Sequence, residues 1–286
     1  RLSVEAGATV RLLFPGGAPD VDQTFALLSV GTGSPDLGTT RLVIDDPSLT
    51  STAYAQDNGR TLALAFQDDS ARRLDQGAAW DGWIVDPGQI HYADSDLGRH
   101  GHVAVAGTLG LRASAVLELD RASTAAGGRL LNSGQLFVGS GLANDGETIN
   151  RGSLTVVGLA NRGMLVNRGD LAIGWPGDPS ARLVNQGSFQ HLAGMLTMAS
   201  NDGDAVAVDN AAGAELRLAG SQSGRMALRN QGRVVVDRGG LLLATTVQQD
   251  SGELWLDGEL DAQATQVLGG VLGGTGVIGG EVLISD

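Results

Sequence analysis

The chain contains neither cysteine nor lysine among its 286 residues. Without cysteine there is no disulfide, and no thiolate that could bind a metal or act as a nucleophile. Without lysine, Schiff-base catalysis and phosphate binding by a P-loop are both excluded. All 19 basic residues are therefore arginines, and 32 acidic residues outnumber them to give a net charge of −13. This charge argues against nucleic acid and against an anionic membrane surface as partners.

Long apolar runs and helical patterns are also missing. No stretch approaches the roughly 18 apolar residues of a membrane-spanning helix. The chain begins with Arg1 rather than Met and shows no signal peptide, which fits a processed chain or a segment of a longer protein. With 44 glycines, the best helical candidate is a short stretch at 68–79. We therefore predict an all-β protein.

Proline is scarce in the second part of the chain. Five of the seven prolines lie before residue 90, and the other two, Pro176 and Pro179, share one loop. Because proline removes a backbone donor, a region without it can form uninterrupted strand ladders. We expect a regular stack after residue 90, with residues 175–181 bulging out of one corner.

What the sequence does contain is a repeated Asn-x-Gly phrase followed by a short apolar strand. The glycines that mark the repeats lie at positions 134, 152, 169, 187, 213, 232 and 252. Their spacing is close to twenty residues, with one longer step that predicts a second bulge near 198–206. A constant period of this length indicates a repeat architecture in which neighbouring units stack to bury their apolar faces.

Each repeat alternates apolar and polar residues, as in Ser153-Leu154-Thr155-Val156. This period of two indicates half-buried strands, and the Gly and Asn between them indicate tight corners that require positive φ. Three short strands and three corners make one coil of a parallel β-helix, with coils about 4.8 Å apart. We expect one inward column formed by Leu136, Leu154, Leu171, Leu216, Val234 and Leu254.

The asparagines of the repeats are predicted to be structural. We expect them to occupy one corner on successive coils and to hydrogen-bond along the stack, each bond contributing about 0.5–1.5 kcal/mol. The alternative is that they line a ligand groove. The predicted structural ladder consists of Asn132, Asn150, Asn167, Asn185 and Asn230.

Three regions follow from these patterns. An irregular β-rich region covers 1–67, a packed connector covers 68–95, and a β-helix with coils of roughly eighteen to twenty residues covers 96–286. In the first region, strands are expected at Leu2–Val4, Thr9–Phe14, Thr24–Val30, Thr40–Ile44 and Thr61–Phe66.

The Gly-Gly-Val-Leu-Gly-Gly-Thr-Gly-Val-Ile-Gly-Gly tail and the Asn-x-Gly-x-Leu strands resemble passenger domains of bacterial autotransporters and related exported β-helix proteins. The block Thr24-Phe-Ala-Leu-Leu28 also resembles such repeats, although in those relatives it usually follows the tail, whereas here it comes before the helix. The resemblance implies an extracellular or cell-surface location and a β-helix fold.

Residues that could carry chemistry are dispersed. Carboxylate doublets occur at Asp45-Asp46 and Asp68-Asp69, and acids spaced two apart occur at Asp94/Asp96 and Asp202/Asp204. Of His91, His100, His102 and His191, only His100 and His102 form an i, i+2 pair, for which no third metal ligand can be named. Arginines beside the repeat asparagines are expected to pair with nearby acids at the surface. We predict no catalytic site, no metal site and no cofactor.

The sequence therefore favours a non-enzymatic structural or adhesive rod. A carbohydrate-active β-helix enzyme is the alternative, and an ice-binding solenoid is disfavoured because the outward strand positions are not a regular threonine array. The expected partners are other copies of the chain, joined head to tail, or other surface components. The predicted assembly edges are Leu2, Val4, Val10, Leu12, Val277, Ile278, Val282 and Ile284.

Overall fold

The computed structural model describes residues 84–175, 181–199 and 205–285 with their side chains, and the strands before them as backbone. All regular elements among these residues are strands, so the all-β prediction is confirmed. In the N-terminal region, β1 (Thr9–Leu12) pairs in parallel with β3 (Arg41–Ile44). A separate antiparallel sheet contains β2 (Thr24–Ser29), β4 (Thr50–Gln56) and β5 (Thr61–Gln67). The strand expected at Leu2–Val4 lies outside the described residues.

The remaining described strands belong to two parallel sheets. The first has 11 strands, in the order β6 (Ala71–Arg73), β8 (Ile90–Ala93), β10 (Thr108–Leu111), β12 (Arg129–Asn132), β14 (Glu147–Asn150), β17 (Met164–Asn167), β20 (Ser188–His191), β23 (Glu215–Leu218), β26 (Arg233–Val236), β28 (Glu253–Leu256) and β30 (Val271–Gly273). The second has 15 strands: β7 (Trp83–Val85), β9 (Asp96–Val105), β11 (Val116–Thr124), β13 (Gln135–Asn144), β15 (Ser153–Val156), β16 (Gly158–Asn161), β18 (Asp170–Ile173), β19 (Arg182–Asn185), β21 (Met195–Met198), β22 (Val206–Asn210), β24 (Ser221–Ser223), β25 (Met226–Asn230), β27 (Leu241–Gln249), β29 (Glu259–Val267) and β31 (Val277–Ile284).

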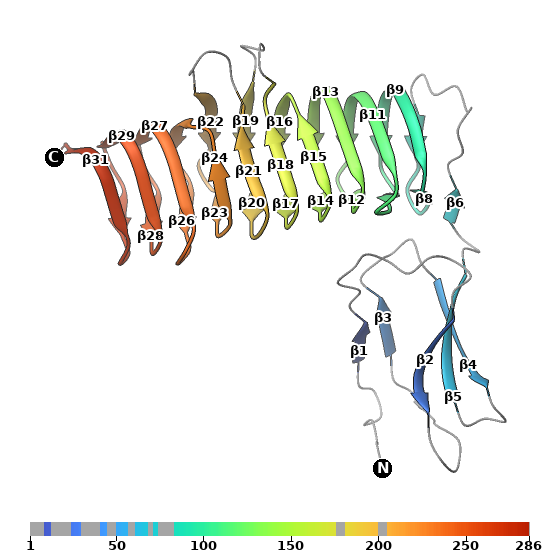
Figure 1. The fold of residues 1–286 in the computed structure, drawn as a ribbon. Helices are drawn as coiled ribbons and strands as arrows, with labels where there is room; N and C mark the ends of the chain where they lie inside the picture. Colours follow the sequence, from blue (N-terminus) through green and yellow to red (C-terminus); the bar gives the residue numbers. More distant parts are fainter. Residues whose placement is uncertain are drawn as a thin grey trace.

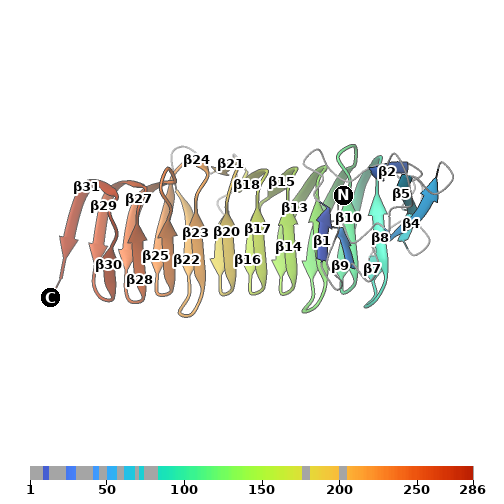
Figure 2. The same ribbon diagram turned by 90° about the horizontal axis from the view of Figure 1, so that it is seen from below.

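Each coil contributes one strand to the first sheet and two strand segments to the second, as β14, β15 and β16 illustrate. The coils lie side by side from β8 to β31 in Figure 1, and Figure 2 shows the same succession from another side. In long strands such as β13 and β27, both segments of the second sheet run on without a break. The predicted parallel β-helix is therefore confirmed.

The register fixes the length of each coil. From Asn144 to its partner Asn161 in the next coil the step is 17 residues, close to the predicted range. The next two steps along the same column, to Asn185 and then to Asn210, are 24 and 25 residues. The step from Asn210 to Asn230 is again 20 residues. The two long steps span the predicted bulges at 175–181 and 198–206, of which residues 176–180 and 200–204 lie outside the described residues.

The parallel ladders begin before residue 96, where the sequence places the start of the β-helix. Strand β8 pairs in register with both β10 and β6, so the segment assigned to a connector contributes strands to the first sheet. Within that segment, residues 71–73 are a strand rather than part of the short helix that the sequence offered as its best helical candidate.

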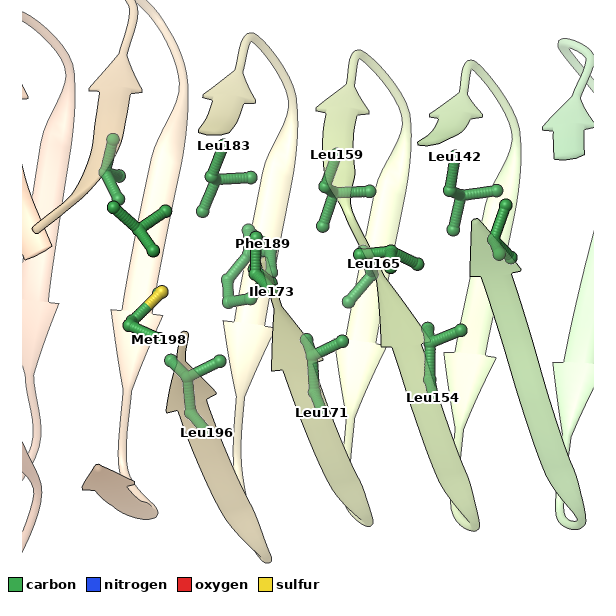
Figure 3. Close-up of a cluster of buried hydrophobic side chains, with 14 of the residues drawn as sticks. Leu142, Leu154, Leu159, Leu165, Leu171, Ile173, Leu183, Phe189, Leu196 and Met198 are labelled. Atoms are coloured by element: carbon green, nitrogen blue, oxygen red, sulfur yellow. The ribbon is translucent and has the colours of Figure 1, made fainter. Parts of the chain in front are cut away.

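The interior consists of apolar columns, one member per coil. Figure 3 shows two of them, one through Leu142, Leu159 and Leu183 and one through Leu154, Leu171 and Leu196. The single predicted leucine column is wrong, because its members divide between the two sheets. The second sheet contains the column Leu136, Leu154 and Leu171. The first sheet contains a different column, in which Phe189 is followed by Leu216, Val234 and Leu254. All of these side chains are at most 2% exposed.

Close stacking, rather than positive φ, explains most of the repeat glycines. At Gly152, an added Cβ would lie 2.1 Å from the carbonyl oxygen of Gly134 in the preceding coil. At Gly169 it would lie 2.1 Å from the carbonyl oxygen of Gly152. Neither Gly152 nor Gly169 has positive φ, so the predicted conformational reason is wrong for these corners. Glycine is required there because the next backbone occupies the space of a side chain.

Candidate functional site

Buried amide side chains form a ladder at the corner that follows the last strand segment of each coil. This long ladder consists of Asn144, Asn161, Asn185, Asn210, Asn230 and Gln249. Each of the five asparagine amide nitrogens donates to the amide oxygen of the next coil, at 2.6–2.8 Å, and the ladder ends at Gln249, which donates to the carbonyl oxygen of Ser251. The second hydrogen of each asparagine amide goes to a backbone carbonyl, as from Asn161 to Ser188 at 3.0 Å. Their side chains are no more than 1% exposed.

A shorter ladder lies at the corner between the first sheet and the second. In this short ladder, Asn132 donates to Asn150 at 2.7 Å, and Asn150 donates to Asn167 at 2.6 Å. The ladder ends at His191, whose Nδ1 lies 2.8 Å from the amide nitrogen of Asn167. Beyond His191 the column becomes apolar, beginning with Leu218.

The prediction that the asparagines hydrogen-bond along the stack is therefore correct, but the prediction that they share one corner is wrong. Of the five predicted members, Asn132, Asn150 and Asn167 belong to the short ladder, and Asn185 and Asn230 belong to the long one. The phrase Asn-x-Gly occurs at both corners, for example at Asn150 and at Asn161 of one coil, so the phrase alone does not identify a corner. The prediction also omits Asn144 and Asn161, although both are followed two residues later by glycine.

His191 is held in one neutral tautomer by its two neighbours. Because an amide nitrogen only donates, Nδ1 accepts the hydrogen bond from Asn167 and Nε2 carries the proton. Nε2 then donates to the carbonyl oxygen of Ser221, at 3.0 Å. Burial lowers the pKa of His191, and the Ser221 hydrogen bond and the charge of Asp170 oppose this shift only in part. The side chain is 1% exposed.

The last described coil exposes interior-facing side chains. Among the described side chains, eleven large apolar residues are exposed, and seven of them lie at or beyond Trp255. Among them, Val282 and Ile284 extend interior columns and are 40% and 64% exposed. Ile278 also ends an interior column and is partly buried against the core, whereas Val277, on the outward side of β31, is 65% exposed. Within the described residues, β31 pairs only with β29.

The opposite predicted edge is less well described. Val10 and Leu12 belong to β1, for which only the backbone is described. Leu2 and Val4 lie outside the described residues.

Surface arginines pair with acids on neighbouring coils. Arg217 lies 2.6 Å from Asp237, and Arg229 lies 2.6 Å from Asp250. The pKa of Asp250 is lowered by hydrogen bonds from Gln248 and Arg229. Because these pairs are solvent-exposed, each contributes at most about 1 kcal/mol. For Arg229, beside Asn230, and for Arg162, beside Asn161 and 3.2 Å from Asp145, the predicted surface pairing is confirmed.

Among the described residues, one arginine is buried. Arg112 is 7% exposed, and its guanidinium carbon lies 4.2 Å from the centre of the Tyr92 ring. Its Nε and Nη2 are buried without a hydrogen-bond partner. The ring face therefore supplies a cation–π contact to this charge.

The residues weighed for chemistry are not assembled into a site in the described part of the chain. His100 Nε2 contacts the carbonyl of Leu97 at 2.8 Å, whereas His102 Nε2 contacts Ser123 Oγ at 3.2 Å. Asp96 accepts a hydrogen bond from its own turn, at Gly98 N. No group of three metal-binding side chains occurs among the described residues. The doublets at 45–46 and 68–69 and the acids at 202 and 204 lie outside them.

Comparisons with protein-family models, with curated proteins and with solved structures each give no match to this chain. In the described residues there is no helix of the length and apolarity needed to cross a membrane.

Proposed function

We propose that the protein is a structural or adhesive β-solenoid of a cell surface or extracellular matrix, and that its copies join head to tail through the last coil. The observation that carries this proposal is that interior columns reach β31 with exposed apolar side chains. The resemblance of the glycine-rich tail to exported β-helix proteins supports the location. A chain built from repeated coils supplies length, stiffness and a regular surface.

The long-ladder column supports a head-to-tail joint. It starts with the buried Val85 in β7, passes through the six amides of the long ladder, and ends with Val267 and the exposed Ile284. Both ends of this column are therefore apolar. Because Val85 is fully buried in the single chain, the residues that cover it would have to move before a second copy, stacked in the same direction, could place Ile284 next to β7 and continue the column. Parallel strand addition would also pair the edge of β31 that faces away from β29.

Charge favours the same direction of stacking. The segment 250–286 contains seven acidic residues and no basic one, and three of the seven, Asp250, Glu253 and Asp261, are paired with arginines of preceding coils. At the other end of the first sheet, strand β6 carries Arg72 and Arg73. Tail-to-tail contact would bring two acidic coils together, whereas head-to-tail contact places acidic residues near arginines. Because a head-to-tail contact does not close on itself, repetition produces a filament.

The test compares apolar positions at the end and on the side of the rod. The double variant Val282→Asp, Ile284→Asp places two charges on β31, and Met164→Asp changes a side chain that is 38% exposed in the middle of the rod. We expect the intact protein to form linear assemblies in light scattering and electron microscopy. The double variant should lose them while the Met164 variant keeps them.

Circular dichroism of each variant provides the control for folding. Assembly that persists unchanged in the double variant, or after deletion of residues 277–286 from a chain that remains folded, would exclude the joint. A wild-type chain that remains monomeric at high concentration would also contradict it.

A further inference from the structure

We propose that His191 is an acid-sensitive breakpoint of the solenoid, at which protonation separates the coil that contains β20 from the coils on either side. The observation is geometric. His191 is the terminal member of the short ladder and makes one hydrogen bond to each neighbouring coil, to Asn167 on one side and to Ser221 on the other. This inference does not depend on the proposed function.

The hydrogen bonds of the short ladder all run in one direction, and this direction leaves no acceptor for a second proton on His191. A protonated ring would point an N–H from Nδ1 at the amide nitrogen of Asn167, so two donors would face each other. Asn167 is held in its present orientation because its oxygen accepts from Asn150 and its nitrogen also donates to Gly169 O, at 2.8 Å. Turning the Asn167 amide would require the amides of Asn150 and Asn132 to turn as well. Those turns would break the bonds of Asn132 to Ser153 O and of Asn150 to Asp170 O.

The residues around His191 leave its ring little space to move and provide little negative charge to stabilise a protonated imidazole. An added Cβ at Gly220 would lie 2.4 Å from His191 Nε2, so the following coil packs directly on the ring. Asp170 is the charged group that acts on the ring from the described residues, and its carboxylate is engaged by the backbone N–H of Met195, at 3.0 Å. From the side of β23, the ring column continues with Leu218, which is apolar and buried. The neighbouring Arg217 is paired with Asp237 instead.

The sign of the pH dependence follows from linkage. Burial lowers the pKa of His191 in the folded state, whereas the unfolded chain binds the proton near the usual value of about 6.5. The contribution of the neutral ring to stability is therefore complete above about pH 6.5 and is lost as the pH falls from there towards the folded-state pKa. A local opening that exposes His191 should become about tenfold more frequent per pH unit across that window.

Asparagine is the informative replacement. Elsewhere in the short ladder, Asn150 bonds both the next side chain and the carbonyl of Asp170, which occupies the same register position as Ser221 in a later coil. His191→Asn would therefore extend the short ladder by one member and remove the titrating group. His102→Asn is the matched control, because His102 is an exposed histidine whose only hydrogen bond among the described residues is to Ser123.

The test is hydrogen exchange of the full chain between pH 7.5 and 5, corrected for the intrinsic exchange rate. In the wild type and in the His102 variant, peptides covering residues 188–192 and 215–222 should lose protection about tenfold per pH unit below about 6.5. Peptides covering 135–156 serve as the internal reference. The His191 variant should show no such loss. Equal pH dependence in wild type and the His191 variant would overturn the proposal.

A second measurement covers the case in which His191→Asn does not fold. Nitrogen-15 NMR of histidine side chains in the wild type should show His191 as the neutral Nε2–H tautomer at about pH 6.5, the usual pKa of histidine. Its protonation should coincide with loss of the amide signals of residues 188–192. A midpoint for His191 at that usual value, or retention of those amide signals through the titration, would rule the breakpoint out.

Discussion

Replacing Asn161 by leucine tests whether the long ladder stabilises the stack. Asn161 accepts a hydrogen bond from Asn144 and donates to Asn185 and to the carbonyl of Ser188, at 2.7, 2.8 and 3.0 Å. Leucine has a similar size but makes none of these three bonds. At about 1 kcal/mol each, the direct loss is about 3 kcal/mol. The amide hydrogen of Asn144 and the oxygen of Asn185 are also left buried without their partners, which raises the expected cost to about 4–6 kcal/mol.

The assay is the local free energy of opening, obtained from hydrogen exchange of the amides in β16 and β19. A local measurement is needed because long repeat arrays do not always unfold in one step. Ala160→Leu, at the adjacent outward and half-buried position, is the control and should change this free energy by less than about 1 kcal/mol. A loss below about 1 kcal/mol for Asn161→Leu would refute the view that the long ladder stabilises the stack.

Further predictions concern the corner, the core and acid. Gly152→Ala should cost at least about 1–3 kcal/mol because its Cβ would meet Gly134 O, whereas Gly158→Ala, with its nearest neighbour at 3.8 Å, should be nearly neutral in thermal unfolding. Phe189→Ala removes a fully buried ring and should lower the free energy of unfolding in urea by about 3–5 kcal/mol, and Gln190→Ala should not. Below about pH 6.5 the wild type should lose thermal stability that His191→Asn retains, because the pKa of His191 is lowered by burial.

The period of the repeat was sufficient to predict the fold. Alternation in segments such as Ser153–Val156 indicated which residues face inward, and each of those strands is found. In residues 1–67, the sequence pattern does not predict the antiparallel strand Thr50–Gln56, because its Thr, Ser, Ala and Gln residues do not alternate between apolar and polar. The lengthening of two coils was visible from the proline-containing loop and from the longer glycine step.

The assignment of residues to corners could not be predicted from spacing. The separation of Gly169 and Gly187 in the sequence resembles one coil, yet Gly187 stacks on Gly163 and the residue that stacks on Gly169 is Gly194. The insertion at 176–180 conceals this change of corner. As a result, the predicted ladder and leucine column each combined two columns. The sequence does not identify His191 as a ladder member, because asparagine occupies that position in the three preceding coils.

The most direct test of head-to-tail assembly uses the absence of native cysteine. One population would carry Ile84→Cys in β7 and another Leu283→Cys in β31, at outward side chains that are 58% and 52% exposed and belong to one register column. After mixing and treatment with a short thiol cross-linker, we expect cross-links between residue 84 of one copy and residue 283 of another. Cross-links between two copies of residue 283, or none at concentrations where assemblies are present, would contradict head-to-tail assembly.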